Sequence, residues 1–253
     1  MFTFLDNFSG QAPQYAKHRP RYPQALYDFL LSEVRHRESA WDCATGNGQV
    51  ATVLARYFHQ VCATDASVAQ LAQAEPATTL NGAPIEYRAC MAEQTPFPDD
   101  SFNLITVAQA LHWLNFDKFY AEVRRVMKPG GLLATWGYGL MRTPLPAVNA
   151  LIGAFSTGTV GPYWDRERTY VDEAYRTLPF PFPELPHPEF QTEVTWTLED
   201  CLGYLRTWSS VQKFIRAESY DPVEVLGARL TAEWTVTETV TFPIFVRAAV
   251  VGR

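Results

Sequence analysis

Short apolar runs alternate with helix-like segments through the first half of the chain. Runs of aliphatic residues are typical of buried strands, whereas apolar residues that recur every three or four positions indicate one face of a helix. The clearest helix stripe is formed by Phe119, Tyr120, Val123 and Val126. We expect strands at Ser39–Ala44, Val61–Thr64, Ile85–Ala89, Phe102–Ala108 and Leu132–Trp136, and helices at Gln49–Phe58, Val68–Ala74 and Phe116–Met127, the last ending at Lys128–Gly131.

Proline and aromatic residues set apart the region from Pro144 to Pro188, which has five prolines between Pro179 and Pro188. Regular strands do not accommodate that density of proline. We therefore expect an insertion over the sheet, with one helix near Ala147–Phe155. Outside it we expect helices at Pro23–Val34, Leu198–Ser209 and Asp221–Trp234, and strands at Glu189–Thr197 and Glu238–Val250.

Strands that alternate with helices predict parallel strands joined by helical crossovers. The expected fold class is α/β, with a Rossmann-like, doubly wound and mostly parallel sheet of seven strands. An N-terminal helical arm precedes the sheet, and the insertion follows its fifth strand.

The charge, the lengths of the apolar runs and the cysteine pattern exclude several classes of function. The 253 residues include 21 Lys+Arg and 27 Asp+Glu, which gives a net charge of -6. Proteins that bind nucleic acid usually carry a basic surface, so this charge disfavours a nucleic-acid partner. No apolar run approaches the roughly 18 residues of a membrane helix, and the N-terminus lacks the pattern of a secretory signal. The four cysteines form no metal-binding pattern, so we expect no metal, free thiols and a cytoplasmic protein. Nothing in the sequence indicates the oligomeric state.

The segment Trp41–Ala51 places Gly46 and Gly48 at the turn between a strand and a helix. Glycines there let a ligand approach the backbone and the N–H groups of the helix N-terminus. This pattern alone suits a dinucleotide equally well.

Two carboxylates refine that interpretation. Asp42, at the end of the first strand, disfavours a pyrophosphate but would stabilise a ligand with an ammonium and a sulfonium, which favours S-adenosylmethionine over NAD. Asp65, 17 residues after Gly48, has the spacing of an acid that binds ribose hydroxyls. Both residues are also typical of strand-end turns and helix caps.

An ordered set of segments carries a family resemblance across Tyr15–Tyr138. The segments are Tyr15–Pro23, Trp41–Gln49, Ala63–Ser67, Ala92–Glu93, Gln109–Trp113 and Lys128–Gly131. With them the chain resembles the class I S-adenosylmethionine-dependent methyltransferases, and more closely the type 11 branch. It is most similar to the subgroup of aconitate-type small-molecule methyltransferases. One departure is Ala44, where the family usually has glycine.

The resemblance implies a single methyltransferase domain over 1–253. Within it, 1–39 would be a lid or arm, 40–138 the cofactor-binding core, 139–188 an insertion or cap, and 189–253 the segment that completes the sheet. The cofactor would be S-adenosylmethionine. Its binding residues would be Tyr15, Arg19, Asp42, Ala44, Gly46, Gly48, Asp65, Ala66, Ala92, Glu93 and Gln109.

The acceptor should lie near Gln109–Trp113, because ligands of open α/β sheets bind beyond the carboxyl ends of strands. We treat Gln109 and His112 as candidate catalytic residues. His112 could act as a general base for a phenol or an amine, whereas a carboxylate acceptor would need none. Packing at a turn is an equal alternative for His112.

Two further features bear on the site. Tyr15 and Arg19 are four residues apart, so one helical turn could present both to the cofactor, although a solvated basic turn is an alternative. The following aromatic and basic residues are candidates for the acceptor pocket, though core packing or a solvated surface suits most of them: Trp136, Tyr138, Tyr163, Trp164, Tyr204, Trp208, Arg142, Arg166 and Arg168.

The leading hypothesis is methyl transfer from S-adenosylmethionine to a small-molecule acceptor, at oxygen, with a carboxylate as one candidate, by in-line displacement. No nucleic-acid or membrane partner is expected. Two alternatives stay open: a cofactor-binding protein without activity, for which Ala44 is the only hint, and an NAD-dependent oxidoreductase.

Overall fold

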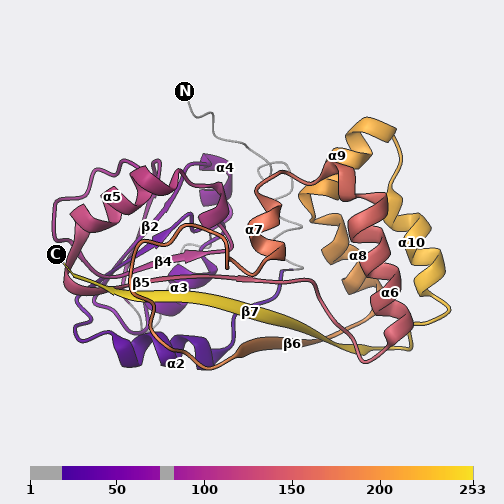
Figure 1. Ribbon diagram of the computed structural model, residues 1–253, viewed down its shortest axis with the longest axis horizontal. Helices are drawn as coiled ribbons and strands as arrows, with labels where there is room; N and C mark the ends of the chain where they lie inside the picture. The colour runs from indigo at the N-terminus through magenta and orange to yellow at the C-terminus, as the bar shows by residue number, and fades with distance from the viewer. Residues whose placement is uncertain (1–18, 75–82, 253) are drawn as a thin grey trace.

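The computed structural model describes residues 19–74 and 83–252, and its centre is a seven-stranded sheet (Figure 1). The strands lie in the order β3-β2-β1-β4-β5-β7-β6. The chain order therefore reverses between β1 and β4, which is where ligands bind in doubly wound sheets. The bounds are β1 Ser39–Cys43, β2 Gln60–Asp65, β3 Ile85–Ala89, β4 Phe102–Ala108, β5 Met127–Tyr138, β6 Phe190–Trp196 and β7 Glu238–Val251.

Strands β1 to β5 run parallel to one another, whereas β7 is antiparallel to both β5 and β6. The first half of β7 pairs with β6 and its second half with β5. The predicted Rossmann-like, mostly parallel sheet of seven strands is confirmed.

The central strands β1 and β4 are buried on both faces, because helices cover this part of the sheet on both sides. In β1, Ala40 packs on the face of α2 (Gln24–Glu33) and α3 (Gln49–Leu54), whereas Trp41 points to the face of α5 (Phe116–Val126). The short helix α4 (Val68–Leu71) follows β2. The predicted helices near these positions are confirmed with slightly shorter bounds, and Pro23 caps α2 rather than lying in its first turn.

The connection between α5 and β5 differs from the expectation. Helix α5 ends at Val126, but Lys128–Gly131 belongs to β5 instead of separating helix and strand. The pairing of β4 with β5 skips from Met127 to Leu132, and Gly130 has φ +76°. The proline and glycines thus form an irregular start to the strand.

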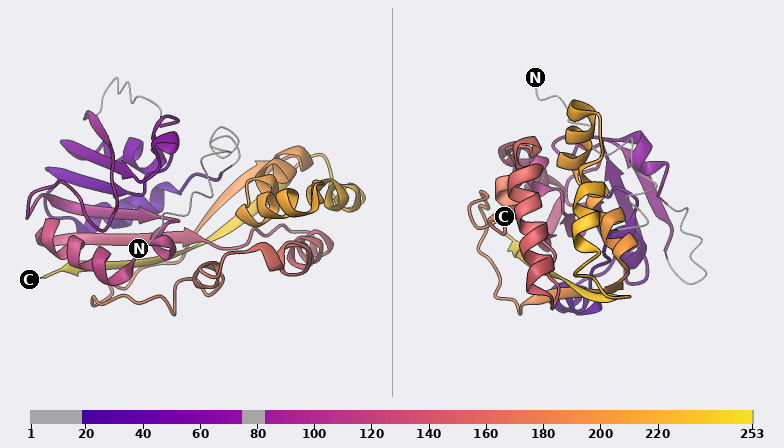
Figure 2. Two further views of the ribbon diagram at one scale, coloured as in Figure 1. Left: turned by 90° about the horizontal axis from the view of Figure 1, so that it is seen from above. Right: turned by 90° about the vertical axis from the view of Figure 1, so that its right-hand side faces the viewer.

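A helical lobe lies beyond one end of the sheet (Figures 1 and 2). It combines α6 (Pro146–Ala154) from the predicted insertion with α8 (Leu198–Arg206), α9 (Ser209–Glu218) and α10 (Pro222–Leu230); β6 leads into the lobe, and β7 leads from it back to the sheet. The sequence analysis missed α9. Its buried side chains are those of Ser209, Ser210, Val211 and Phe214, so its buried face is part polar and part apolar.

The rest of the insertion crosses between the sheet and the lobe. It contains two short helical turns, a π-helical turn at Phe155–Thr159 and a 3₁₀ turn at Gly161–Tyr163, followed by α7 (Arg168–Asp172). Its proline-rich stretch 179–189 forms neither helix nor strand, as expected. In the described ranges, every helix is too short or too polar to cross a bilayer.

Candidate active site

A cavity of about 240 Å³ lies at the carboxyl ends of β1, β2, β4 and β5. Loops that follow these strands form one wall, and the helical lobe with the segment around α7 forms the other. This is the edge at which the strand order reverses. The predicted site residues that line it are Arg19, Ala44, Gly46, Asp65, Ala66, Ala92, Glu93, Gln109 and His112.

The loop after β1 has three residues in the left-handed region: Ala44 at φ +53°, Gly46 at +57° and Gly48 at +80°. Gly48 caps α3, and a Cβ atom there would lie 2.5 Å from the hydroxyl of Tyr87. Gly48 therefore shapes the loop without lining the cavity. Ala44 adopts a conformation that glycine adopts without a steric penalty.

Asp65 joins the loops that follow β1 and β2. One carboxylate oxygen accepts a hydrogen bond from the Gly46 amide at 2.9 Å, and the other accepts one from the Ser67 amide at 2.8 Å. A carboxylate can accept about four hydrogen bonds, which is compatible with binding ribose hydroxyls as well.

Asp42 lies behind the cavity and does not line it. Its side chain accepts hydrogen bonds from the hydroxyls of Thr45 and Thr106 and from the Ala51 amide in the first turn of α3. Burial raises the pKa of Asp42 to about 6, against the lowering effect of these three donors. The structure therefore gives Asp42 a role in holding the loop, and direct contact with a cofactor stays a prediction.

The loop after β3 brings Ala92 and Glu93 to the cavity. Glu93 Oε1 accepts a hydrogen bond from the Asn115 amide at 2.8 Å. Among the described residues, Glu93 Oε2 and Gln70 Oε1 are buried without a hydrogen-bond partner. Two unsatisfied acceptors at one cavity are suited to a ligand that carries amino or hydroxyl donors.

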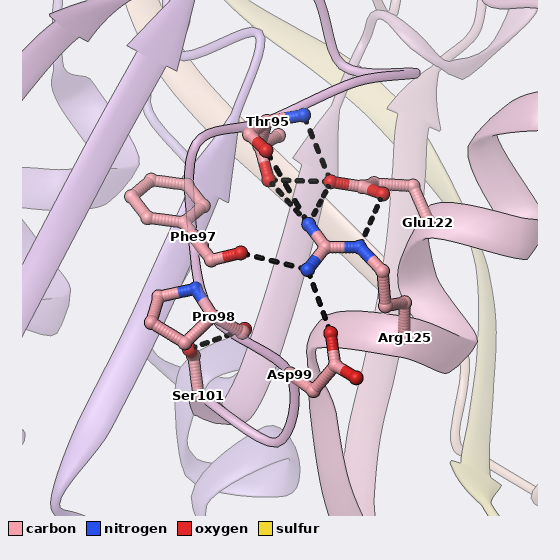
Figure 3. Close-up of polar contacts among 7 residues, drawn as sticks. All are labelled: Thr95, Phe97, Pro98, Asp99, Ser101, Glu122 and Arg125. Carbon is pink, nitrogen blue, oxygen red and sulfur yellow. Dashed lines mark hydrogen bonds and ion pairs between the residues drawn. The ribbon is translucent and has the colours of Figure 1, made fainter.

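A network on α5 anchors the continuation of this loop (Figure 3). Arg125 binds the Glu122 carboxylate, the Phe97 carbonyl at 2.8 Å and the Asp99 carboxylate at 2.9 Å. Glu122 in turn accepts a hydrogen bond from the Thr95 amide at 2.8 Å. The helix thus fixes the loop that carries Ala92 and Glu93.

Gln109 ends β4 with φ +55°. Its side-chain oxygen accepts a hydrogen bond from the Tyr138 amide at 2.8 Å, and its own amide donates to the Trp136 carbonyl at 2.7 Å. The side chain therefore clamps the ends of β4 and β5 while it lines the cavity. Its predicted place near the reacting methyl group stays a prediction.

His112 lies in a 3₁₀ turn at Leu111–Trp113 and is 6% exposed. Its Nδ1 atom is 2.8 Å from the hydroxyl of Tyr175. Burial, followed by the nearby charge of Arg168, lowers the pKa of His112 to about 3. The imidazole is therefore neutral at physiological pH and is a weak proton acceptor, which disfavours a general-base role.

Arg19 reaches the cavity from the segment before α2. It donates to the hydroxyl of Tyr138 and, at 3.3 Å, to the Thr207 carbonyl, and it lies 5.4 Å from the centre of the Tyr204 ring. Arg19 thus links the arm, β5 and the helical lobe. Tyr15 lies outside the described residues.

The lobe wall of the cavity is mainly aromatic, and it also carries one arginine, Arg168, and the carboxylates of Asp165 and Glu167. Of the candidate pocket residues, Tyr138, Trp164, Tyr204, Trp208 and Arg168 line the cavity, whereas Trp136, Tyr163, Arg142 and Arg166 do not. Sequence reasoning missed Gln70 and Asp165, which also line it. Gln70 had one usable signal, since it lies five residues after Asp65 in the helix next to the loop.

Comparisons with known proteins agree with this geometry. A family model for a methyltransferase domain matches residues 41–135. A Dictyostelium discoideum protein provisionally assigned as a methyltransferase is 31% identical over 251 residues, which cover 96% of this chain and 94% of that protein. A structure from Anaeromyxobacter dehalogenans, provisionally assigned as a type II methyltransferase, has a TM-score of 0.81 at 40% identity and covers 92% of this chain and 97% of that chain.

In fold alone, the chain is also similar to a Haemonchus contortus phosphoethanolamine N-methyltransferase in complex with phosphomonomethylethanolamine and S-adenosylhomocysteine. The TM-score is 0.50 at 17% identity, and the match covers 100% of this chain and 61% of that chain. The matches to the first two relatives extend over nearly the whole of each chain. The chain therefore belongs to the class I S-adenosylmethionine-dependent methyltransferases.

Proposed function

We propose that this methyltransferase acts on a small molecule and transfers the methyl group to an acceptor oxygen, that of a carboxylate, as the resemblance to aconitate-type enzymes implies. The observation that carries the proposal is Arg168 in the lobe wall. The cation of Arg168 lies 4.4 Å over the Trp164 ring, and its Nε atom donates to Asp172 at 2.8 Å. A fixed guanidinium in an aromatic wall suits an acceptor that carries a carboxylate.

The lining residues fit the cofactor. Ala44 and Gly46 offer a backbone surface without large side chains, and Asp65 offers acceptors for ribose hydroxyls. The two unsatisfied oxygens of Glu93 and Gln70 suit the amino and hydroxyl donors of an adenosyl group. Ala66 and Ala92 leave room for the flat adenine ring, and Asp42 and Gly48 hold the loop from behind.

When bound, S-adenosylmethionine supplies a methyl group on a positively charged sulfur that is already activated for displacement. The protein then needs chiefly to position the acceptor and to exclude water, which in favourable cases supplies about 7 to 11 kcal/mol. Gln109 would hold the β4 end beside the reacting groups, and Tyr15 and Arg19 would close the arm over them. A carboxylate acceptor carries no proton that must be removed.

Two further elements belong to this proposal. The four cysteines are all free thiols, which suits a reducing compartment such as the cytoplasm. The net charge of -6 supports a small-molecule partner over nucleic acid.

Calorimetric titration with S-adenosylmethionine, S-adenosylhomocysteine and NAD tests the cofactor site first. We expect micromolar binding of the first two and none of NAD. A screen of small carboxylic acids, with matched carboxamides, phenols and amines, then tests the acceptor by formation of S-adenosylhomocysteine. Turnover confined to amines or phenols would overturn the carboxylate proposal, and cofactor binding without any turnover would favour a protein that has lost activity.

A further inference from the structure

Tyr175 is completely buried beneath the cavity, and its hydroxyl is 2.8 Å from Nδ1 of His112. The two rings lie 5.8 Å apart. Tyr175 and the preceding Ala174 both have left-handed backbone conformations, with φ +58° and +53°. Residues with a Cβ atom adopt this region rarely, and two in succession indicate a segment held there by its surroundings.

The contacts around the segment show what holds it. Arg247 on β7 donates to the Tyr175 carbonyl at 3.1 Å and also to the Leu178 carbonyl. The Tyr175 ring packs edge to face against Phe245, with 4.7 Å between ring centres. Contacts with β7 therefore place the Tyr175 phenol beside His112.

The protons and acceptors available to Tyr175 and His112 decide which of the two donates in their hydrogen bond. Burial raises the pKa of Tyr175, so the phenol keeps its proton. His112 Nδ1 lies 2.8 Å from the hydroxyl, and the backbone groups of His112 and Leu111 lower the pKa of the phenol, as donors to its oxygen do. A buried hydroxyl is expected to donate where it can, so Nδ1 accepts, and the imidazole proton lies on Nε2.

The other ring nitrogen faces a different environment. His112 lines the cavity, and Nε2 makes no hydrogen bond with any residue that the structure describes. Arg168 lines the same cavity, and its charge acts on the imidazole. An N–H donor and a guanidinium therefore both border the acceptor side of the site.

We infer that Tyr175 is a positioning residue that locks His112 in the Nε2–H form, so that His112 donates a hydrogen bond to an anionic oxygen of the acceptor instead of taking a proton from it. This inference rests on the proposed function for the identity of the acceptor. The arrangement favours a carboxylate, because an N–H donor and a cation that border the same part of the cavity both stabilise a negative charge.

The tautomer can be observed without any acceptor. In protein labelled with ¹⁵N-histidine, with His112→Asn used to assign the signal, we expect His112 to show a protonated Nε2 and an unprotonated Nδ1 from about pH 5 to about pH 8. Tyr175→Phe removes the hydroxyl that donates to Nδ1, so the signal should move toward a mixture of tautomers. A proton on Nδ1 in the wild type, titration near pH 6.5, or an unchanged tautomer in Tyr175→Phe would each overturn the inference.

A kinetic comparison uses the acceptor that the screen identifies. Asparagine at position 112 keeps an N–H donor but cannot act as a base, so His112→Asn should retain most of kcat with no new pH dependence. His112→Ala should raise KM for the acceptor roughly 10- to 100-fold and leave cofactor affinity unchanged. If both variants lose activity equally, His112 acts as a base and the inference fails. If no carboxylate turns over, the proposed function fails, while the NMR result still decides the tautomer.

Discussion

The carboxylate of Asp65, at the end of β2, accepts a hydrogen bond from the backbone amide of Gly46, which lies in the loop that follows β1. Its other oxygen accepts one from the Ser67 amide. The acid that the family resemblance assigns to the cofactor ribose therefore also sets the shape of the glycine loop. A variant without the Asp65 side chain would therefore lose both the hydrogen bonds that shape the loop and the ribose contact that the resemblance implies.

Asp65→Ala should accordingly weaken binding of S-adenosylmethionine by about 100-fold or more, since bonds to a charged group contribute about 1.5 to 3 kcal/mol each. Calorimetric titration measures the change. Asp117→Ala, an exposed acid at the start of α5, is the matched control and should leave affinity unchanged. Equal affinity in Asp65→Ala and the wild type would remove Asp65 from the binding site.

Ala44→Gly should stabilise the protein. The left-handed conformation at φ +53° penalises alanine, and glycine removes the penalty at some cost in unfolded-state entropy. We expect the free energy of unfolding to rise by about 0.5 to 1 kcal/mol in urea titrations. Ala154→Gly, at φ -61° at the end of α6, should instead lower it by a similar amount. Destabilisation in both variants would mean that the Ala44 methyl group contributes packing that outweighs its strain.

Gly137→Ala should destabilise the sheet where β5 meets Gln109. A Cβ atom at Gly137 would lie 2.6 Å from Gln109 Oε1 and 2.6 Å from the Phe245 ring. Overpacking of this kind costs about 1 to 3 kcal/mol, measurable by urea unfolding. Gly139→Ala is the control, because its Cβ atom would meet only Pro243 at 3.4 Å. Similar stability of the two variants would show that Gln109 and Phe245 can move aside.

The hydrophobic pattern along the chain was enough to predict the sheet, because most inner strands are short apolar runs and the connections between them are amphipathic helices. The same reasoning missed α9, although its buried side carries Val211 and Phe214 beside Ser209 and Ser210. It also misjudged Lys128–Gly131, where a strand begins irregularly instead of a loop. The second error occurs where pairing with a neighbouring strand overrides the local preference of proline and glycine.

Most of the residues predicted to bind the cofactor line one cavity, because they lie in short motifs at strand ends. The acceptor side could not be predicted in this way, since it depends on contacts between segments far apart in the chain. Tyr175 and His112 are 63 residues apart in the sequence, and no pattern around residue 175 predicts their contact. Asp42 is an intermediate case: its position was clear, but its burial behind the loop follows only from the fold.

The buried Asp42 gives the protein a distinct pH dependence. Burial raises its folded-state pKa from 3.8 to about 6, so folding favours the protonated form. The associated stability is fully present below about pH 3.8 and is lost as the pH rises through about 6, a change of about 3 kcal/mol. The difference in unfolding free energy between the wild type and Asp42→Asn, which cannot ionise, should follow this curve. A difference that is constant with pH would show that Asp42 titrates normally.

Arg168→Gln tests the carboxylate clamp directly. Its guanidinium is held by Asp172 and stacked on Trp164, so its removal should cost acceptor binding and not cofactor binding. We expect KM for a carboxylate acceptor to rise roughly 10- to 100-fold, since hydrogen bonds to charged groups contribute about 1.5 to 3 kcal/mol, while the Kd for S-adenosylhomocysteine stays the same.

Arg166→Gln provides the matched control for this clamp, because Arg166 is exposed and lies outside the cavity lining. Arg168→Lys keeps the charge but loses the planar fork, so it should recover only part of the affinity. If Arg168→Gln instead lowers kcat and KM together, the arginine strains the bound acceptor rather than simply holding it. If Arg166→Gln and Arg168→Gln raise KM for the acceptor equally, the increase reflects the net charge of the protein. The acceptor carboxylate must then be recognised elsewhere in the cavity.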